Sequence, residues 1–340
     1  MASPTNNNER FQQQLAVVHQ SATAYWQTDL VDNRKDLDAI QVVKVTGGKM
    51  AAILPAHNGF PSVFCKVYFY DRGFQFEVAG LQAADAMPLV SGVRVPAVIS
   101  VMPQFKAIIS ERRSWHDSAS PIKRFFIQSL RVDWANIGAW LRQFHDSQVS
   151  SERNDYFLRK KFEKIAAHIQ VLSPLFTNAQ LGQMEHIIQS AREYFKTTPV
   201  EWVISHGDFG LDNIKFADGI MDIIDFEDCQ PAPRAFDILN FLTRLDYTGR
   251  FPHRYSTYDR IRSEFLSSYG MPLEPTPAAN LFYLLIKLDM IESYQRRQVV
   301  ESAWLYSTTV YRHFKLAGLK QLTNWLDIYD HQETTFWVKS

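Results

Sequence analysis

Apolar segments of strand-like composition, separated by polar and turn residues, recur through the first third of the chain. Segments rich in β-branched and aromatic residues, bounded by turn residues, are typical of strands. The predicted strands and extended segments are 41–45, 62–70, 93–101 and 107–110. A short helix is expected over 74–86, and Gly47-Gly48 predicts a turn between the first two strands.

After about residue 120 the apolar residues recur at helical spacing. In 133–146 the residues Trp134, Ile137, Leu141 and Phe144 share one helical face, and Asp133 is the expected cap. Further helices are predicted at 156–172, at 178–196 and through most of 235–340.

Two strand signals interrupt this helical region. A strand is expected up to Ser205, and the apolar runs on both sides of Asp218-Gly219 predict a hairpin. A strand-rich third followed by a helix-rich remainder predicts an α+β chain with two lobes, residues 1–110 and residues 111–340, and a cleft between them.

Composition narrows the functional classes. The 340 residues are 46% hydrophobic and 21% charged, which is typical of a globular chain. Basic and acidic residues number 36 each, so no charge excess favours nucleic acid or an anionic membrane. The polar N-terminus lacks the apolar run of a secretory signal, and the two cysteines form no metal-binding pattern, so we expect a cytoplasmic protein.

The segment 205–237 carries the clearest chemistry. Asp208 lies in the loop after the predicted strand, Asn213 follows in the same loop, and Asp225 comes after the hairpin. Phosphoryl transfer needs a carboxylate that orients the attacking hydroxyl and accepts its proton, together with oxygen ligands for Mg²⁺. Asp208 is the expected base, and Asn213 and Asp225 are the expected metal ligands.

This combination resembles the aminoglycoside phosphotransferase and choline kinase family, relatives of the protein kinases. His206-Gly207-Asp208 with Asn213 is similar to the family's catalytic loop, and Ile224-Asp225-Phe226-Glu227 to its metal-binding motif. The resemblance implies a bilobal protein-kinase-like fold, with ATP or GTP and Mg²⁺ as cofactors. It also implies that His206 and Asp237 support the catalytic loop.

The resemblance assigns nucleotide binding to the N-terminal lobe. Lys66 is the expected lysine for the α- and β-phosphates, and Glu77 is the acidic residue expected to hold it. Gly47 and Gly48 are candidates for the loop over the phosphates. Glu111 lies in the segment where the family's hinge contacts adenine through its backbone.

Departures from the protein kinases favour a small substrate. Common protein kinases have a lysine two residues after the catalytic Asp, where this chain has Gly210, and a glycine where it has Glu227. Only a short stretch separates Asp225 from Asp237, which leaves little room for a peptide-docking loop. The chain is therefore predicted to be a small-molecule kinase. An atypical protein-directed kinase and a catalytically silent nucleotide-binding protein stay as alternatives.

The acceptor is predicted only as a class: a hydroxyl of a sugar-like, amino-alcohol, nucleoside or aminoglycoside-type molecule. Basic residues slightly outnumber acidic ones over 229–340, which disfavours a highly cationic substrate. Asp289 and Glu292 share one helical face and are candidates for binding an amine, but ordinary surface and core roles are preferred for them. The pattern does not predict an oligomeric state.

Overall fold

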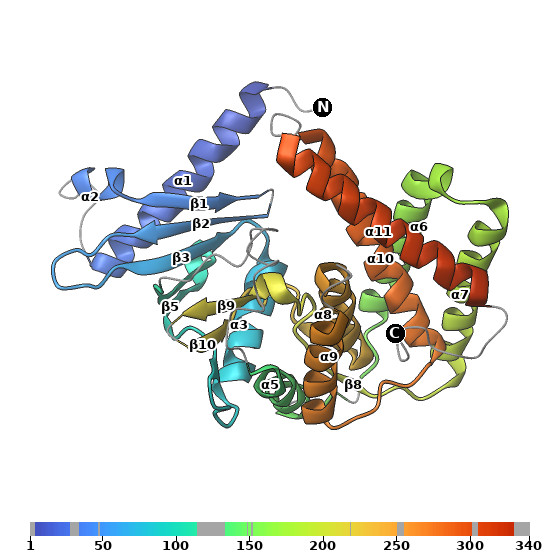
Figure 1. Cartoon of the computed structure of the whole chain (residues 1–340). Coiled ribbons are helices and arrows are strands. Elements are labelled where there is room, and N and C mark those ends of the chain that lie inside the picture. Colours follow the sequence, from blue (N-terminus) through green and yellow to red (C-terminus); the bar gives the residue numbers. More distant parts are fainter. Residues whose placement is uncertain are drawn as a thin grey trace. The chain divides into compact units, whose positions relative to one another are not determined.

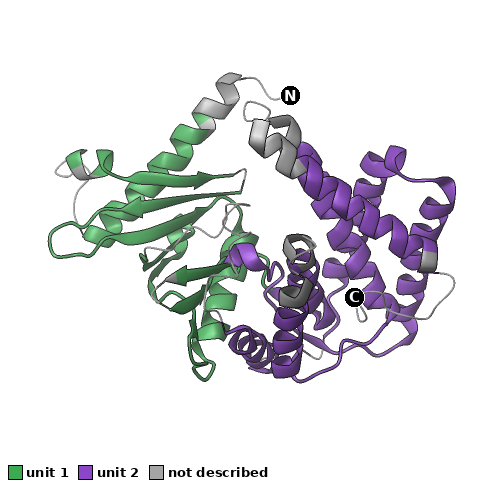
Figure 2. Cartoon of the chain, in the orientation of Figure 1, with its two compact units in different colours: residues 1–117, 214–229 green, residues 118–213, 230–340 purple. Residues whose placement is uncertain are grey.

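The computed structural model describes residues 4–27, 34–46, 48–113, 133–147, 149–150, 152–217, 219–249, 255–300 and 305–329. The chain divides into two compact units (Figure 2). The first holds residues 1–117 and 214–229, and the second holds 118–213 and 230–340. The sequence-based division, 1–110 and 111–340, differs in where it places the hairpin. Its strand β10 (Ile220–Ile223) pairs in parallel with β4 (Val93–Arg94), which joins it to the first unit.

A five-stranded antiparallel sheet forms the centre of the first unit (Figure 1). Its strands lie in the order β1-β2-β3-β6-β5. Their bounds are Gln41–Val45 for β1, Lys49–Leu54 for β2, Val63–Tyr68 for β3, Val98–Met102 for β5 and Ala107–Glu111 for β6. The strands predicted at 41–45, 62–70 and 107–110 are confirmed. Strand β2, directly after the Gly47-Gly48 turn, is an addition to the prediction.

Helix α1 (Pro4–Trp26) covers one face of this sheet. Its buried Val18, Ala22 and Trp26 belong to the same core as Met50 of β2 and Cys65 of β3. Helix α3 (Asp71–Asp85) corresponds to the helix predicted at 74–86 and packs on β3. Short helices at Arg34–Asp38 (α2) and Pro103–Phe105 (η1) complete this part.

The predicted hairpin is present in the first unit. Strand β9 (Ile214–Ala217) pairs antiparallel with β10, and Gly219 at the turn has φ of 76°, a conformation that glycine adopts without a steric penalty.

The second unit is mainly helical. Its helices are α5 (Trp134–Ser147), α6 (Asp155–Leu172), α7 (Asn178–Thr197), α8 (Ala235–Gly249), α9 (Tyr255–Tyr269), α10 (Pro277–Val300) and α11 (Leu305–Tyr329), with short turns at Ser173–Leu175 (η3) and Leu211–Asn213 (η4). The cap predicted for α5 is present, because Asp133 Oδ1 accepts hydrogen bonds from the N–H groups of Ala135 and Asn136. Helix α10 contacts α6, α7, α8 and α11. Its side chains from Leu281 to Leu288 are all buried, as expected of a central helix.

A small sheet in the second unit leads into the catalytic-loop sequence. Strand β8 (Trp202–Ser205) lies between β7 (Val149–Ser150) and β11 (Gln230–Pro233), and both pairings are antiparallel. None of the helices in the described ranges is long and apolar enough to cross a membrane. Both cysteines, Cys65 and Cys229, are buried thiols.

Candidate active site

The pleat of the sheet determines where Lys66 points. Cys65 and Val67 of β3 face helix α1, so Lys66 between them faces the opposite side, since successive side chains of a strand alternate. Helix α3 carries Glu77 to that side. Lys66 Nζ donates a 2.7 Å hydrogen bond to Glu77 Oε1, so the structure contains the ion pair that the sequence predicts.

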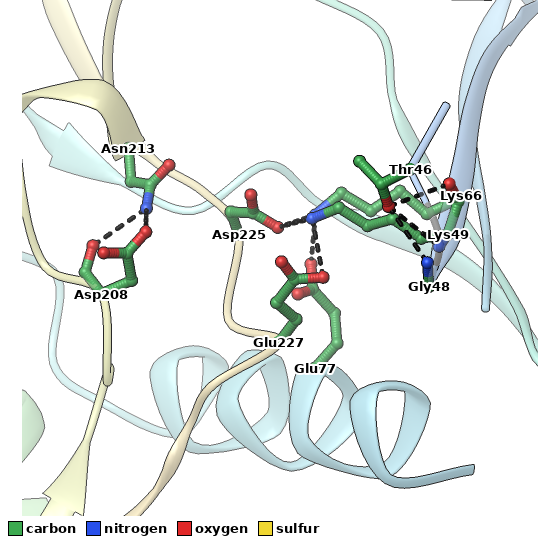
Figure 3. Close-up of polar contacts among 9 residues, drawn as sticks. All are labelled: Thr46, Gly48, Lys49, Lys66, Glu77, Asp208, Asn213, Asp225 and Glu227. Carbon is green, nitrogen blue, oxygen red and sulfur yellow. Dashed lines mark hydrogen bonds and ion pairs between the residues drawn. The ribbon is translucent and has the colours of Figure 1, made fainter. Parts of the chain in front are cut away.

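Asp225 joins the same cluster from the end of the hairpin (Figure 3). Lys66 Nζ lies 3.1 Å from Asp225 Oδ1. Burial by itself lowers the pKa of Lys66, but the carboxylates of Asp225 and Glu77 outweigh it and hold that pKa well above its ordinary value. The lysine is therefore a permanent cation at neutral pH.

Lys49 is a further member that the sequence analysis did not identify. Its Nζ donates to Asp225 Oδ1 at 2.6 Å and lies 2.8 Å from Glu227 Oε2. Ala51 pairs with Lys66 across β2 and β3, and Lys49 lies two residues from Ala51, so the two lysines share one face of the sheet. Lys49 is 3% exposed, which marks it as part of a buried charge cluster rather than as a surface lysine.

The carboxylate of Asp225 is held by one oxygen. Both lysines contact Oδ1, and within the described part of the chain Oδ2 has no polar partner. Burial raises the pKa of Asp225, but Lys66 and Lys49 outweigh this effect and hold that pKa well below its ordinary value. Asp225 also has φ of 71°, which is uncommon for a residue other than glycine and recurs at functional sites.

The catalytic-loop residues Asp208 and Asn213 contact each other in the second unit (Figure 3). Asn213 Nδ2 donates to the backbone carbonyl of Asp208 at 2.9 Å and to Asp208 Oδ2 at 3.1 Å. The Asn213 backbone N–H donates to the Gly210 carbonyl at 2.9 Å, which closes the loop on itself. The amide nitrogen is thereby fixed, and Asn213 Oδ1 accepts no hydrogen bond from the described residues.

Asp237 at the start of α8 binds the backbone of this loop. Its two carboxylate oxygens accept hydrogen bonds from the N–H groups of His206 (2.7 Å) and Gly207 (3.0 Å). His145 Nε2 lies 3.1 Å from Asp237 Oδ2, and Tyr269 O–H lies 2.8 Å from His145 Nδ1. Asp237 and His145 are both fully buried, so this network anchors the loop from the interior of the unit.

The charge states in this network follow from burial and contacts. Burial is the largest effect on the pKa of His145 and lowers it, and the net shift is downward although Asp237 acts in the opposite direction. Burial raises the pKa of Asp237, but its hydrogen bonds, above all the one with His145, lead to a net lowering. A neutral His145 therefore donates through Nε2 to an ionised Asp237 and accepts at Nδ1 from Tyr269. The ring of His206 packs edge-on against Phe209, with centroids 5.6 Å apart.

The remaining predicted residues lie in the first unit. Gly47 is outside the described residues. The N–H groups of Gly48 and Lys49 donate to Thr46 Oγ1 at 3.3 Å and 3.1 Å, so this stretch forms a tight turn. The Glu111 N–H donates to the Ala97 carbonyl at 2.9 Å, and its side chain lies 3.3 Å from Arg94 and 3.4 Å from Arg113. The contact of this segment with adenine stays a prediction from the sequence.

The predicted metal ligands have the chemistry that Mg²⁺ prefers. Asp225 Oδ2 and Asn213 Oδ1 are hard oxygen donors, and both lack protein partners in the described part of the chain. Among the described residues, no group of three or more His, Cys, Asp and Glu side chains forms a metal site by itself. Each of these side chains is therefore suited to bind Mg²⁺, and that both bind the same ion is a prediction from the sequence.

Comparison with known proteins supports the interpretation of the segment that contains the catalytic-loop sequence. Residues 128–272 match the phosphotransferase enzyme family. This match confirms the resemblance predicted from the sequence, and it confirms the class of enzyme, a phosphotransferase. No curated protein matches the chain significantly in sequence.

Solved structures show the same fold. A choline/ethanolamine kinase family protein from Mesorhizobium loti is similar with a TM-score of 0.51 and 14% identity, over 83% of this chain and 87% of that one. Aminoglycoside 2'-phosphotransferase-IIIa, solved as its GDP complex, gives 0.51 and 11% over 83% and 92%. An amicoumacin kinase gives 0.50 and 12% over 84% and 89%. The predicted kinase-like α+β fold is confirmed.

Proposed function

We propose that this protein transfers the γ-phosphate of Mg·ATP to a hydroxyl group of a small molecule. The observation that carries the proposal is the Lys66–Glu77–Asp225 cluster, in which a buried lysine is held between two carboxylates. The match of residues 128–272 to phosphotransferase enzymes supports it independently. GTP is the alternative nucleotide.

Each residue of the first unit has a distinct part in nucleotide binding. Lys66 binds the α- and β-phosphates as a fixed positive charge, and Glu77 holds its ammonium group in place. Asp225 offers Oδ2 to the metal, while Lys49 and Lys66 hold Oδ1. Asp225 Oδ2 would help to hold Mg²⁺, which would supply positive charge against the negative charge that develops on the phosphates.

Asp208 is the proposed base. It orients the acceptor hydroxyl, whose oxygen forms a bond to the γ-phosphorus while the bond from that phosphorus to the β–γ bridging oxygen breaks. The proton of the hydroxyl passes to Asp208, and ADP leaves with the electron pair of the broken bond. Asn213 keeps the Asp208 carboxylate in a fixed orientation. That Asn213 and Asp225 bind the same metal ion stays a prediction from the sequence.

Two features favour a small acceptor with few positive charges. The chain between Asp225 and Asp237 includes β11, which pairs with β8 instead of forming a long docking segment. On α10, Asp289 lies 2.8 Å from Lys164, and Glu292 lies 2.5 Å from His168 and 3.5 Å from Arg296. These carboxylates already have basic side chains of the protein as partners, so a polycationic substrate gains little from them.

A panel of acceptors tests the proposal. The full chain is incubated with Mg·ATP or Mg·GTP and with sugars, amino alcohols, nucleosides and aminoglycosides, and release of ADP or GDP is measured. We expect one class to raise the release well above the rate with water alone, and Asp208→Asn to abolish that increase. Binding of nucleotide without acceptor-dependent release for any class would contradict the proposal and favour the silent alternative.

A further inference from the structure

The side chain of Arg244 reaches from helix α8 to the catalytic loop. Its Nη2 donates to Asp208 Oδ1 at 2.7 Å, and its Nε donates to Asn240 Oδ1 at 2.8 Å. Nη1 lies 3.7 Å from Asp212 Oδ2. Arg244 therefore contacts the proposed base directly, and Asn240 one helical turn earlier holds the guanidinium in place.

Asp208 is consequently held at both carboxylate oxygens. Asn213 contacts Oδ2 from within the loop, and Arg244 contacts Oδ1 from the helix. Two contacts on different oxygens fix the plane of the carboxylate, whereas a single contact leaves it free to rotate. A general base acts efficiently only when its oxygen faces the hydroxyl, so this orientation bears directly on turnover.

Gly210 provides the space that Arg244 occupies. A Cβ atom at Gly210 would lie 2.8 Å from Arg244 Cδ, closer than real Cβ contacts allow, so the arginine side chain would have to shift. Its backbone does not have the positive φ seen at Gly207, so the lack of a side chain, rather than backbone freedom, is what the position requires. The missing side chain at Gly210 in the catalytic loop and the long side chain of Arg244 on α8 therefore fit together.

We propose that Arg244 is a positioning residue for Asp208. Gly210, which has no side chain, leaves the space that the arginine needs to reach the carboxylate. This inference rests on the proposed function, because it assigns to Asp208 the role of base. The protein kinases place a lysine at the position of Gly210. Here the positive charge beside the base comes instead from a helix later in the chain.

The test is a double-mutant cycle on the full chain. The variants Arg244→Ala, Arg244→Lys, Gly210→Ala, Gly210→Ala/Arg244→Ala and Gly210→Lys/Arg244→Ala are compared with wild type. ADP release from Mg·ATP is measured with the best acceptor of the panel, and kcat, both KM values and thermal unfolding are recorded. Arg260→Ala is the matched control, since Arg260 on α9 is exposed and pairs only with Glu264 four residues away among the described residues.

We expect kcat of Arg244→Ala to fall about 100-fold, as for a misplaced catalytic group, with the KM for Mg·ATP unchanged. Gly210→Ala should also lower kcat, and the double alanine variant should be no slower than Arg244→Ala alone. Gly210→Lys/Arg244→Ala should recover part of kcat, because the new lysine occupies the vacated space. If Arg244 only stabilised the fold, Arg244→Ala would lower the temperature of thermal unfolding, and Gly210→Lys/Arg244→Ala would not recover kcat.

The outcomes separate this inference from the proposed function. Wild-type kcat in Arg244→Ala, or additive losses from Gly210→Ala and Arg244→Ala, would overturn the role of Arg244 while leaving the kinase activity in place. A wild-type protein that releases no ADP with any acceptor would overturn both. If Arg244→Ala does not fold, Arg244→Lys and Gly210→Ala still decide the matter through their kcat values.

Discussion

The ammonium group of Lys49 lies 2.6 Å from Oδ1 of Asp225, although the two residues are 176 positions apart. Lys66 contacts the same oxygen, so two lysines on one face of the sheet neutralise one aspartate. Because Glu77 also pairs with Lys66 and Glu227 with Lys49, the contacts form a row of alternating charges with a carboxylate at each end. Such a set positions the remaining oxygen of Asp225 without leaving a buried charge unpaired.

Replacing Lys49 with methionine should weaken nucleotide binding. The change keeps the volume but removes one charge-assisted contact to Asp225, worth about 1.5–3 kcal/mol. We expect KM for Mg·ATP to rise about 10- to 100-fold, measured as initial rates over a range of nucleotide and Mg²⁺ concentrations. Lys44→Met is the control, because Lys44 is an exposed lysine that acts on Asp225 only through its charge. An equal rise of KM in both variants would show that nucleotide binding depends on the overall positive charge and not on the contact between Lys49 and Asp225.

Lys66→Ala should raise KM for Mg·ATP and also lower kcat, since the proposed role of the ammonium group is to contact the phosphates throughout the reaction. Glu77→Gln should have a smaller effect in the same direction, because the amide still accepts a hydrogen bond but no longer carries charge. Steady-state kinetics and calorimetric nucleotide binding check both variants. Lys106→Ala removes a more exposed pair with Asp71 and should leave the kinetics unchanged. Unchanged binding in Lys66→Ala would contradict the assignment.

Asp208→Asn and Asp225→Ala should fail in different ways. Asp208→Asn keeps the shape of the base but removes its proton acceptance, so Mg·ATP still binds while turnover falls about 10²- to 10⁴-fold. Asp225→Ala removes a charged metal ligand, so it should abolish activity and weaken Mg·nucleotide binding. Nucleotide titrations followed by calorimetry separate the two outcomes. An Asp208→Asn enzyme with the wild-type rate on its acceptor would refute the role of the base.

Stability of the folded chain should fall as pH drops below about 6.5, the ordinary pKa of histidine. Burial keeps the pKa of His145 below that value in the folded state, so the unfolded chain binds a proton first and acid favours unfolding. One such group contributes at most about 1.4 kcal/mol per pH unit. Thermal unfolding between about pH 7.5 and about pH 5.5 measures the slope. His145→Gln should have a shallower slope, and an unchanged slope would exclude His145 as its source.

Gly80→Ala should destabilise the first unit. The added Cβ would lie 2.7 Å from Phe226 Cβ and 2.9 Å from Cys229 Sγ, so α3 or the segment after Asp225 must shift. We expect a loss of about 1–3 kcal/mol in the free energy of unfolding, measured by denaturant titration. Gly182→Ala is the matched control in helix α7, where nothing lies within 4 Å of the new Cβ. It should stabilise by about 0.4–1 kcal/mol through helix propensity and unfolded-state entropy.

Local patterns predicted most of the elements, but not all of them. The strands, the hairpin and α5 have periodicities and turn residues that identify them in the sequence. Helix α1 was missed although its buried residues Val18, Ala22, Tyr25 and Trp26 recur at helical spacing. The many polar residues between these positions make the helical spacing of the apolar ones hard to recognise in the sequence.

Some of the site residues can also be predicted from local sequence, whereas others can be identified only from the tertiary structure. Lys66 and Glu77 come from a strand and the helix that follows it, so their meeting depends on short-range geometry. Lys49 and Arg244 act on residues that only the tertiary fold brings near them. Strand β2 is buried on both faces, so it lacks the alternation that marks an inward-facing lysine. The sequence identifies Gly210 as a departure from the protein kinases. The need for glycine at this position is visible only in the fold, where the side chain of Arg244 on α8 lies beside it.

Burial of both cysteines makes the protein suitable for selective labelling. Burial raises the pKa of Cys65 to about 12, so almost no reactive thiolate is present at neutral pH. Cys229 is likewise buried. A cysteine introduced at Leu89, which is 94% exposed after helix α3, would then react with a maleimide dye before either native thiol. The dye would then mark one defined position of the first unit while both native thiols stay unmodified.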